Sequence, residues 1–151
     1  MHAFGPPTDP FADPALLDHA GVIQLREART LVLDGNALAA LDALTLAHHA
    51  GVPAELMPHA RVIEAAALIL ADRPPAAITL ALDAWRNYPD VAALPAVLGS
   101  AHLANGDAKS AAHTMHAALV SEDPDRSLSL HRAVLERLFV VLVRDRRSDL
   151  P

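Results

Sequence analysis

The sequence has no cysteine, a single lysine and only five aromatic residues among 151. Without cysteine the chain can form no disulfide, no thiolate metal site and no cysteine nucleophile. Its formal charge of −6 argues against a surface for nucleic acid or an anionic membrane. The most apolar run, Leu138–Val143, is far below the roughly 20 residues that cross a bilayer. We therefore expect a cytoplasmic protein, and the excess of arginine over lysine suggests a bacterial source.

Alanine and leucine are abundant instead, with 32 and 24 residues. Both form helices well, whereas the β-branched and aromatic residues typical of strands are scarce outside short runs. The composition therefore predicts an all-α fold, and the length fits one domain with its own core. We expect a flexible proline-rich lead-in over residues 1–13, a helical domain over 14–147 and a tail over 148–151.

Glycine, proline and capping residues divide the domain into seven expected helices. Asp13, Asn36, Asp90 and Asp107 are the expected side-chain caps of the first, second, fifth and sixth helices, and Asp72 with two prolines opens the fourth. Counting caps, the helices are expected over about residues 14–34, 36–51, 58–71, 72–88, 90–105, 107–122 and 125–145. The short turns between them predict antiparallel neighbours.

Small residues recur at fixed separations in three successive helix pairs. The three sets are Ala28, Ala40, Leu44 and Ala47; Ala65, Ala77, Ala81 and Ala84; and Gly99, Ala111, Met115 and Ala118. The turn residues Gly35, Asp72 and Gly106 each lie five positions before the second member of their set. The second and third units are offset by 34 residues and the first and second by 37. This periodicity indicates a repeated helical hairpin.

A 34-residue helix–turn–helix unit with small residues at these positions resembles the tetratricopeptide repeat family. The match is best over Leu98–Leu119 (LGSAHLANGDAKSAAHTMHAAL) and extends over about residues 14–124 as three degenerate units. The first two units lack the Leu-Gly pair, and none has the family's aromatic residue at the helix crossing. The resemblance implies a right-handed stack of antiparallel hairpins with a C-terminal capping helix. It also implies a protein-binding scaffold or chaperone-like adaptor, similar in layout to the small tetratricopeptide chaperones of bacterial secretion systems.

In this family the first helix of each pair lines a concave groove that holds a peptide or helix. The corresponding positions here are Val22, Leu25, Arg26, Arg29, His59, Val62, Ile63, Ala66, Ile69, Ala93, Val97, Ser100 and Leu103. Family members that bind a C-terminal carboxylate use lysine, asparagine and arginine at such positions, and this chain offers only two arginines, so we expect no carboxylate clamp. The apolar groove either binds a partner protein or is covered by the lead-in, the last helix or a second chain.

The last expected helix has apolar residues on more than one face. Leucines at heptad spacing form one stripe, and Phe139, Val140 and Val143 add apolar surface elsewhere. A terminal helix of a repeat stack normally has a polar outer side. We therefore predict self-association through these three residues, with a homodimer as the alternative function. A last helix that is simply buried would explain the same pattern without self-association, and a detached repeat domain of a regulator or an enzyme is a third interpretation of the chain.

Motifs for catalysis and metal binding are missing from the sequence. His113 and His116 lie one helical turn apart, but no His-Glu-x-x-His motif accompanies them, and a solvated face explains them better. There is no Gly-x-Ser-x-Gly elbow, and the six glycines are dispersed, so no phosphate-binding loop is expected. The mid-helix carboxylates Asp42, Glu64 and Asp83 are likewise expected to face solvent. We expect no enzyme activity, no cofactor and no metal.

Overall fold

The computed structural model describes residues 13–120, 128 and 131–148. These residues form seven α-helices and two short 3-10 helices and include no strand, which confirms the all-α prediction. The α-helices are α1 (Ala20–Leu33), α2 (Ala37–Ala50), α3 (Met57–Leu70), α4 (Pro74–Asn87), α5 (Ala93–Ala104), α6 (Ala108–Leu119) and α8 (Arg132–Ser148). The 3-10 helices are η2 (Pro14–Leu16) and η3 (Ala54–Leu56).

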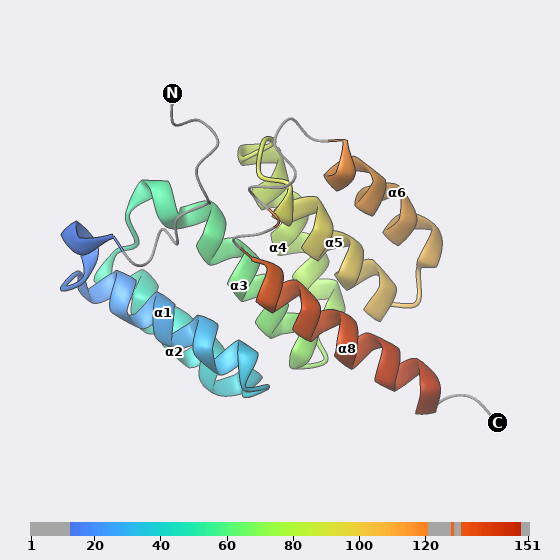
Figure 1. The fold of residues 1–151 in the computed structure, drawn as a ribbon, viewed down its shortest axis with the longest axis horizontal. Helices are drawn as coiled ribbons and strands as arrows, with labels where there is room; N and C mark the ends of the chain where they lie inside the picture. Colours follow the sequence, from blue (N-terminus) through green and yellow to red (C-terminus); the bar gives the residue numbers. More distant parts are fainter. Residues whose placement is uncertain (1–12, 121–127, 129–130, 149–151) are drawn as a thin grey trace.

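Consecutive helices pack in pairs, α1 with α2, α3 with α4 and α5 with α6. The pairs are joined because α2 also packs on α3 and α4 on α5, while α3 contacts both α1 and α5. The last helix, α8, contacts α1, α3 and α5 rather than forming a pair with α6. Figure 1 shows α8 crossing in front of α3, with the α1–α2 pair on one side and α5 and α6 on the other.

The three turns within the pairs have the same backbone structure. Gly35, Asp72 and Gly106 adopt positive φ angles of 80°, 61° and 82°. In each turn the N–H of this residue donates to the carbonyl three residues back, and the next N–H donates to the carbonyl five residues before it. This is the Schellman arrangement that ends a helix with a left-handed residue. The turns expected from the sequence at 37- and 34-residue spacing are therefore present as three copies of one local structure.

Small residues are buried where the helices of a pair meet. The alanines at the repeated positions and Leu44 are all buried, and Met115 is half-buried. At Gly99 an added Cβ would lie 2.6 Å from Cγ of Met115 and 3.1 Å from Oγ1 of Thr114. Since a Cβ does not fit there, glycine is what allows α5 and α6 to approach so closely.

The first helix begins later than expected. Asp13 does cap a helix, but only the 3-10 turn over Pro14–Leu16, and α1 starts at Ala20. His19 is its N-cap, and its Nδ1 accepts a hydrogen bond from the N–H of Gly21 at 3.1 Å. A Cβ on Gly21 would collide with the carbonyl oxygen of Gly51, so the start of α1 lies directly against the end of α2. We infer that this close packing, rather than the Asp-Pro signal, sets the boundary.

Two further predicted helix starts were wrong. Asp72 occupies the left-handed position of its turn, and the cap of α4 is Arg73. The fifth helix starts at Ala93 with Ala92 as its cap, and Asp90 is exposed in the preceding turn. Ala92 and Ala93 are fully buried, so packing replaces side-chain capping at this end.

Two other expected helix starts are confirmed. Asn36 accepts from the N–H of Ala39 at 3.4 Å, and Asp107 accepts from the N–H of Ser110 at 3.0 Å.

The last helix is shifted relative to the expected 125–145, since α8 spans Arg132–Ser148 and passes the expected domain end by one residue. The predicted lead-in, apart from residue 13, and the tail beyond residue 148 lie outside the described residues, as do 121–127 and 129–130.

Candidate functional site

The face expected to bind a partner is covered by the chain's own last helix. α8 contacts α1, α3 and α5, the three helices that carry the expected groove. Nine of the thirteen groove residues are buried, namely Val22, Leu25, Val62, Ile63, Ala66, Ile69, Ala93, Val97 and Ser100. Arg26, Arg29, His59 and Leu103 are half-buried. The last helix, one of the candidates for covering this face, therefore lies over it.

One apolar stripe holds α8 in this position. Val134 and Leu138 are fully buried members of the central hydrophobic core, and Leu142 is 8% exposed on the same side of the helix. Leu135 packs against the core while remaining half-buried. The heptad leucines of the sequence therefore mark the inward side of α8.

A pair of histidines joins the start of α8 to the start of α3. Nδ1 of His59 lies 2.7 Å from Nε2 of His131, and the two rings stack with their centroids 4.9 Å apart. His131 is 2% exposed, and its carbonyl accepts the N–H of Leu135, so it stands just before the first turn of α8. His59 was expected to contact a partner, and it instead contacts the last helix. The sequence gives no signal for His131, because the pairing spans 72 residues.

Two arginines are used within the fold. Arg26 donates from Nη2 to the carbonyl of Leu17 at 3.2 Å. This hydrogen bond engages one of the two arginines that were considered for a carboxylate clamp. Arg137 of α8 reaches the first hairpin turn, where its Nη2 would lie 2.5 Å from a Cβ added to Gly35. Within the described residues the Nε of Arg137 is buried without a hydrogen bond. Its guanidinium therefore ties α8 to the α1–α2 turn mainly by packing.

A groove remains open beside α8. It has a cavity volume of about 280 Å³ between α5, α6 and α8, and its lining residues are Ala96, Ser100, Met115, Ala118, Leu119, Leu128, Leu135 and Phe139. The hydroxyl of Ser100 donates to the carbonyl of Ala96 at 3.1 Å and is thus already satisfied. The groove can bind apolar side chains but offers no side-chain group for acid–base or nucleophilic chemistry.

Leu119 and Phe139, which line this groove, face solvent, and so do the residues that follow each of them in the sequence. Leu119 is 68% exposed, Val120 66%, Phe139 65% and Val140 46%. Phe139 and Val140 are two of the residues expected to mediate self-association, and the third, Val143, is half-buried. Sequence reasoning did not identify the wall formed by Met115 and Leu119 of α6, because the side of α6 that α8 leaves uncovered depends on where α8 packs.

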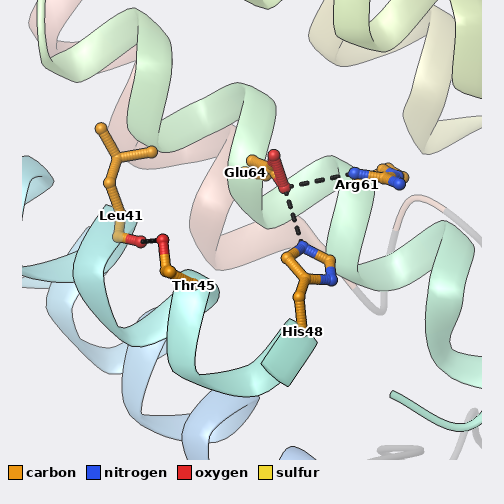
Figure 2. A network of polar contacts seen from close by, with 5 residues as sticks. All are labelled: Leu41, Thr45, His48, Arg61 and Glu64. Carbon is orange, nitrogen blue, oxygen red and sulfur yellow. Dashed lines mark hydrogen bonds and ion pairs between the residues drawn. The ribbon is translucent and has the colours of Figure 1, made fainter. Parts of the chain in front are cut away.

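A polar network on another face joins the first two hairpins. His48, at the end of α2, lies with Nε2 3.1 Å from Oε2 of Glu64 on α3, and Arg61 donates to the same oxygen at 3.4 Å (Figure 2). Thr45 donates its hydroxyl to the carbonyl of Leu41 on the same helix at 3.1 Å. The side chains of His48, Arg61 and Glu64 are 34%, 31% and 20% exposed, and ion pairs near the surface contribute about 0–1 kcal/mol. The network therefore gives Glu64 a structural contact between α2 and α3.

The remaining candidates for chemistry are dispersed. Asp42 and Asp83 are exposed on α2 and α4, and His113 and His116 are exposed on α6. Among the residues that the structure describes, no three histidine or acidic side chains are grouped as metal ligands. None of the helices described is both long and apolar enough to span a membrane.

Comparison of the chain with protein-family models, curated proteins and solved structures finds no match.

Proposed function

We propose that this chain is a protein–protein interaction module that binds an apolar helix or peptide in the groove between α5, α6 and α8. The observation that carries the proposal is the combination of an apolar cavity with exposed large side chains at its edge, above all Leu119 and Phe139. Exposed apolar patches on single chains typically mark partner surfaces. A partner would fit best if it presents large apolar residues at helical spacing.

We further propose that the three helix pairs form a tetratricopeptide-like, right-handed stack. Three copies of one turn at 37- and 34-residue spacing support it, as do the buried small residues within the pairs and the contacts of α3 with both α1 and α5. In this arrangement α8 occupies the face that the family uses for binding. The binding surface is then displaced to the edge that α8 itself creates, and the role is that of a scaffold or chaperone-like adaptor. The proposal includes no catalytic step, metal or cofactor.

A selection experiment tests the proposed groove. A display library of short helical peptides with randomised apolar positions is selected on the full chain, and the enriched peptides are titrated against two variants. Leu119→Asp introduces a carboxylate at the groove edge, whereas Leu38→Asp introduces one at a comparably exposed leucine on α2. We expect binding to weaken at least tenfold in Leu119→Asp and to be unchanged in Leu38→Asp.

Failure to enrich any peptide would contradict the proposal. Equal binding to both variants would do the same, because the selected peptides would then bind outside the groove. Circular dichroism of both variants is the control for folding, and their helical signal should match that of the unmodified chain since both leucines are exposed.

A further inference from the structure

The turn between α5 and α6 contains an asparagine directly before a glycine. The sequence has three asparagines, Asn36, Asn87 and Asn105, and only Asn105 is followed by glycine. Because glycine has no Cβ, its main-chain nitrogen can approach the side-chain amide carbon of a preceding asparagine with little steric hindrance. Asn105 therefore has the neighbour that most favours attack on its side chain.

Hydrogen bonds restrain the side chains of the other two asparagines. Oδ1 of Asn36 accepts from the N–H of Ala39 at 3.4 Å, and Nδ2 of Asn87 donates to the carbonyl of Asp83 at 3.1 Å. Asn105 is exposed, and among the residues that the structure describes its side chain makes no hydrogen bond. Its amide group is thus free to rotate towards the following main-chain nitrogen.

The space around this turn is open. Nothing lies within 4 Å of a Cβ added to Gly106, whereas the corresponding glycine of the first turn, Gly35, is covered by the guanidinium of Arg137. Gly35 also follows Asp34, whose side chain is ionised at neutral pH and is therefore a poor electrophile. The middle turn has an aspartate in place of the glycine. Of the three copies of this turn, only the third combines a side-chain amide with room for a ring.

We propose that Asn105 is a site of spontaneous deamidation. The main-chain nitrogen of Gly106 loses its proton and bonds to Cγ of Asn105, and the side-chain nitrogen leaves as ammonia, so that a succinimide ring forms. Water then opens the ring at one of its two carbonyl carbons. Opening at Cγ gives aspartate in an unchanged main chain. Opening at the main-chain carbonyl carbon gives isoaspartate, in which the chain continues through Cγ.

The turn has to open before the ring can close. The N–H of Gly106 donates to the carbonyl of Leu103 at 3.1 Å, and that of Asp107 donates to the carbonyl of His102 at 2.9 Å. These bonds hold Asn105 at a ψ of 4° and engage the attacking nitrogen. Opening breaks the two bonds but uncovers no buried side chain of the turn, because its three residues are all exposed. Such local opening costs far less than global unfolding, so the reaction proceeds in the folded chain, only more slowly than in the unfolded one.

Isoaspartate at this position alters the junction of α5 with α6. It adds a carbon to the main chain just before Gly106, so the turn can no longer keep both of its hydrogen bonds while Asp107 caps α6 through the N–H of Ser110. Since α6 supplies Met115 and Leu119 to the groove, conversion loosens one groove wall. Any loss of peptide binding that results depends on the function proposed above, whereas the modification itself does not.

Peptide mapping by mass spectrometry tests the proposal. The full chain is incubated at mildly alkaline pH, with and without guanidinium chloride, and digested with trypsin, which releases residues 87–109 with both Asn87 and Asn105 in one peptide. We expect Asn105 to convert at least about tenfold faster than Asn87, which corresponds to a barrier lower by about 1.4 kcal/mol. Conversion should accelerate with rising pH, because the attacking nitrogen must lose its proton, and in guanidinium chloride, because the turn is then open.

Asn105→Gln is the matched control, since it keeps the amide but can close only a larger, less favourable ring. It should show no conversion at residue 105, and the same incubation should leave its melting temperature unchanged while lowering that of the original chain. Conversion at Asn105 that occurs only in guanidinium chloride would overturn the proposal, as would equally fast conversion at Asn87. A melting temperature that does not fall as isoaspartate accumulates would overturn the proposed effect on α6.

Discussion

Both faces of α8 contain large apolar residues, but the environments of these residues differ completely. Leu138 is fully buried among the residues of the central core, whereas the next residue, Phe139, is 65% exposed at the edge of the groove. Hydrophobicity does not distinguish them, since both are large apolar side chains. What distinguishes them is direction, because successive residues of a helix point about 100° apart and only one side of α8 faces α1, α3 and α5. The inward face stabilises the fold, and the outward face is available for binding.

The largest predicted effect on stability comes from comparing the truncation of a large residue on the inward face of α8 with that of one on its outward face. Leu138→Ala should lower the free energy of unfolding by about 2–5 kcal/mol, because it leaves a cavity in the core. Phe139→Ala should change it by less than about 0.5 kcal/mol, as is usual for exposed positions. Urea denaturation at low protein concentration, where any dimer is dissociated, measures both. Similar losses for the two variants would show that Phe139 is part of the core.

The histidine pair at the start of α8 should give the next largest effect. His131→Ala should cost about 1–3 kcal/mol, because it removes a buried hydrogen bond to His59 and the stacked ring. His59→Ala removes the same contact, so the double variant should be less destabilised than the sum of the two single variants. If the losses of unfolding free energy of the two single variants simply add up in the double variant, His59 and His131 are not coupled. The neighbouring exposed substitution Arg132→Ala is the control and should have no measurable effect.

The hairpin turns provide a test of how closely α8 is held to the first pair. Gly35→Ala and Gly106→Ala both place a Cβ at a positive φ, which costs roughly 1–2 kcal/mol. At Gly106 the new Cβ meets nothing within 4 Å, while at Gly35 it meets the guanidinium of Arg137. Gly35→Ala should therefore destabilise more in thermal unfolding, and the excess should disappear in the Arg137→Ala background. An equal cost at both turns from the outset would show that Arg137 is not held against the turn.

A glycine substitution in the middle turn, at Asp72, should instead raise the stability of the chain. Asp72 has a φ of 61° at the position that glycine occupies in the other two turns. Asp72→Gly relieves a left-handed conformation of a residue with a Cβ and should stabilise the chain by up to about 1 kcal/mol. Asp34→Gly is the matched control, since Asp34 has a right-handed φ and ψ of −80° and −5° and should gain nothing. A loss of thermal stability in Asp72→Gly would mean that the aspartate side chain stabilises the turn.

The smallest predicted effect concerns α6, which supplies one wall of the groove. Hydrogen bonds from the side chain and the backbone N–H of Ser110 hold the pKa of Asp107 below its ordinary value of 3.8. A lowered folded-state pKa means that the ionised cap stabilises the fold above the ordinary pKa and that this contribution is lost as the pH falls through the lowered value. Asp107→Ala should therefore be less stable than the unmodified chain near neutral pH, and the difference should shrink in acid. A pH-independent difference in melting temperature would contradict this.

The parts of the fold that were predicted from sequence are those that depend on nearby residues. The turns at Gly35, Asp72 and Gly106 were located because a left-handed residue and its two hydrogen bonds involve only the last helical turn before it. The helix starts at Ala20 and Ala93 were not located, because close packing and burial, rather than capping side chains, determine them. Local chemistry therefore predicts a helix end where hydrogen bonds of the last turn determine it, and fails where close packing determines it.

The sequence alone determined that the chain is helical, that its hairpins recur and that Phe139, Val140 and Val143 add apolar surface beyond the heptad leucines of the last helix. Only the tertiary structure decided which of the apolar helix faces pack against each other. Several faces in this alanine- and leucine-rich chain are equally apolar, and burial alone does not choose between them because the hydrophobic effect has no direction. The choice comes from contacts between distant residues, such as His59 with His131 and Arg137 with the turn at Gly35. These contacts place α8 over α1, α3 and α5, and so leave the groove open beside it.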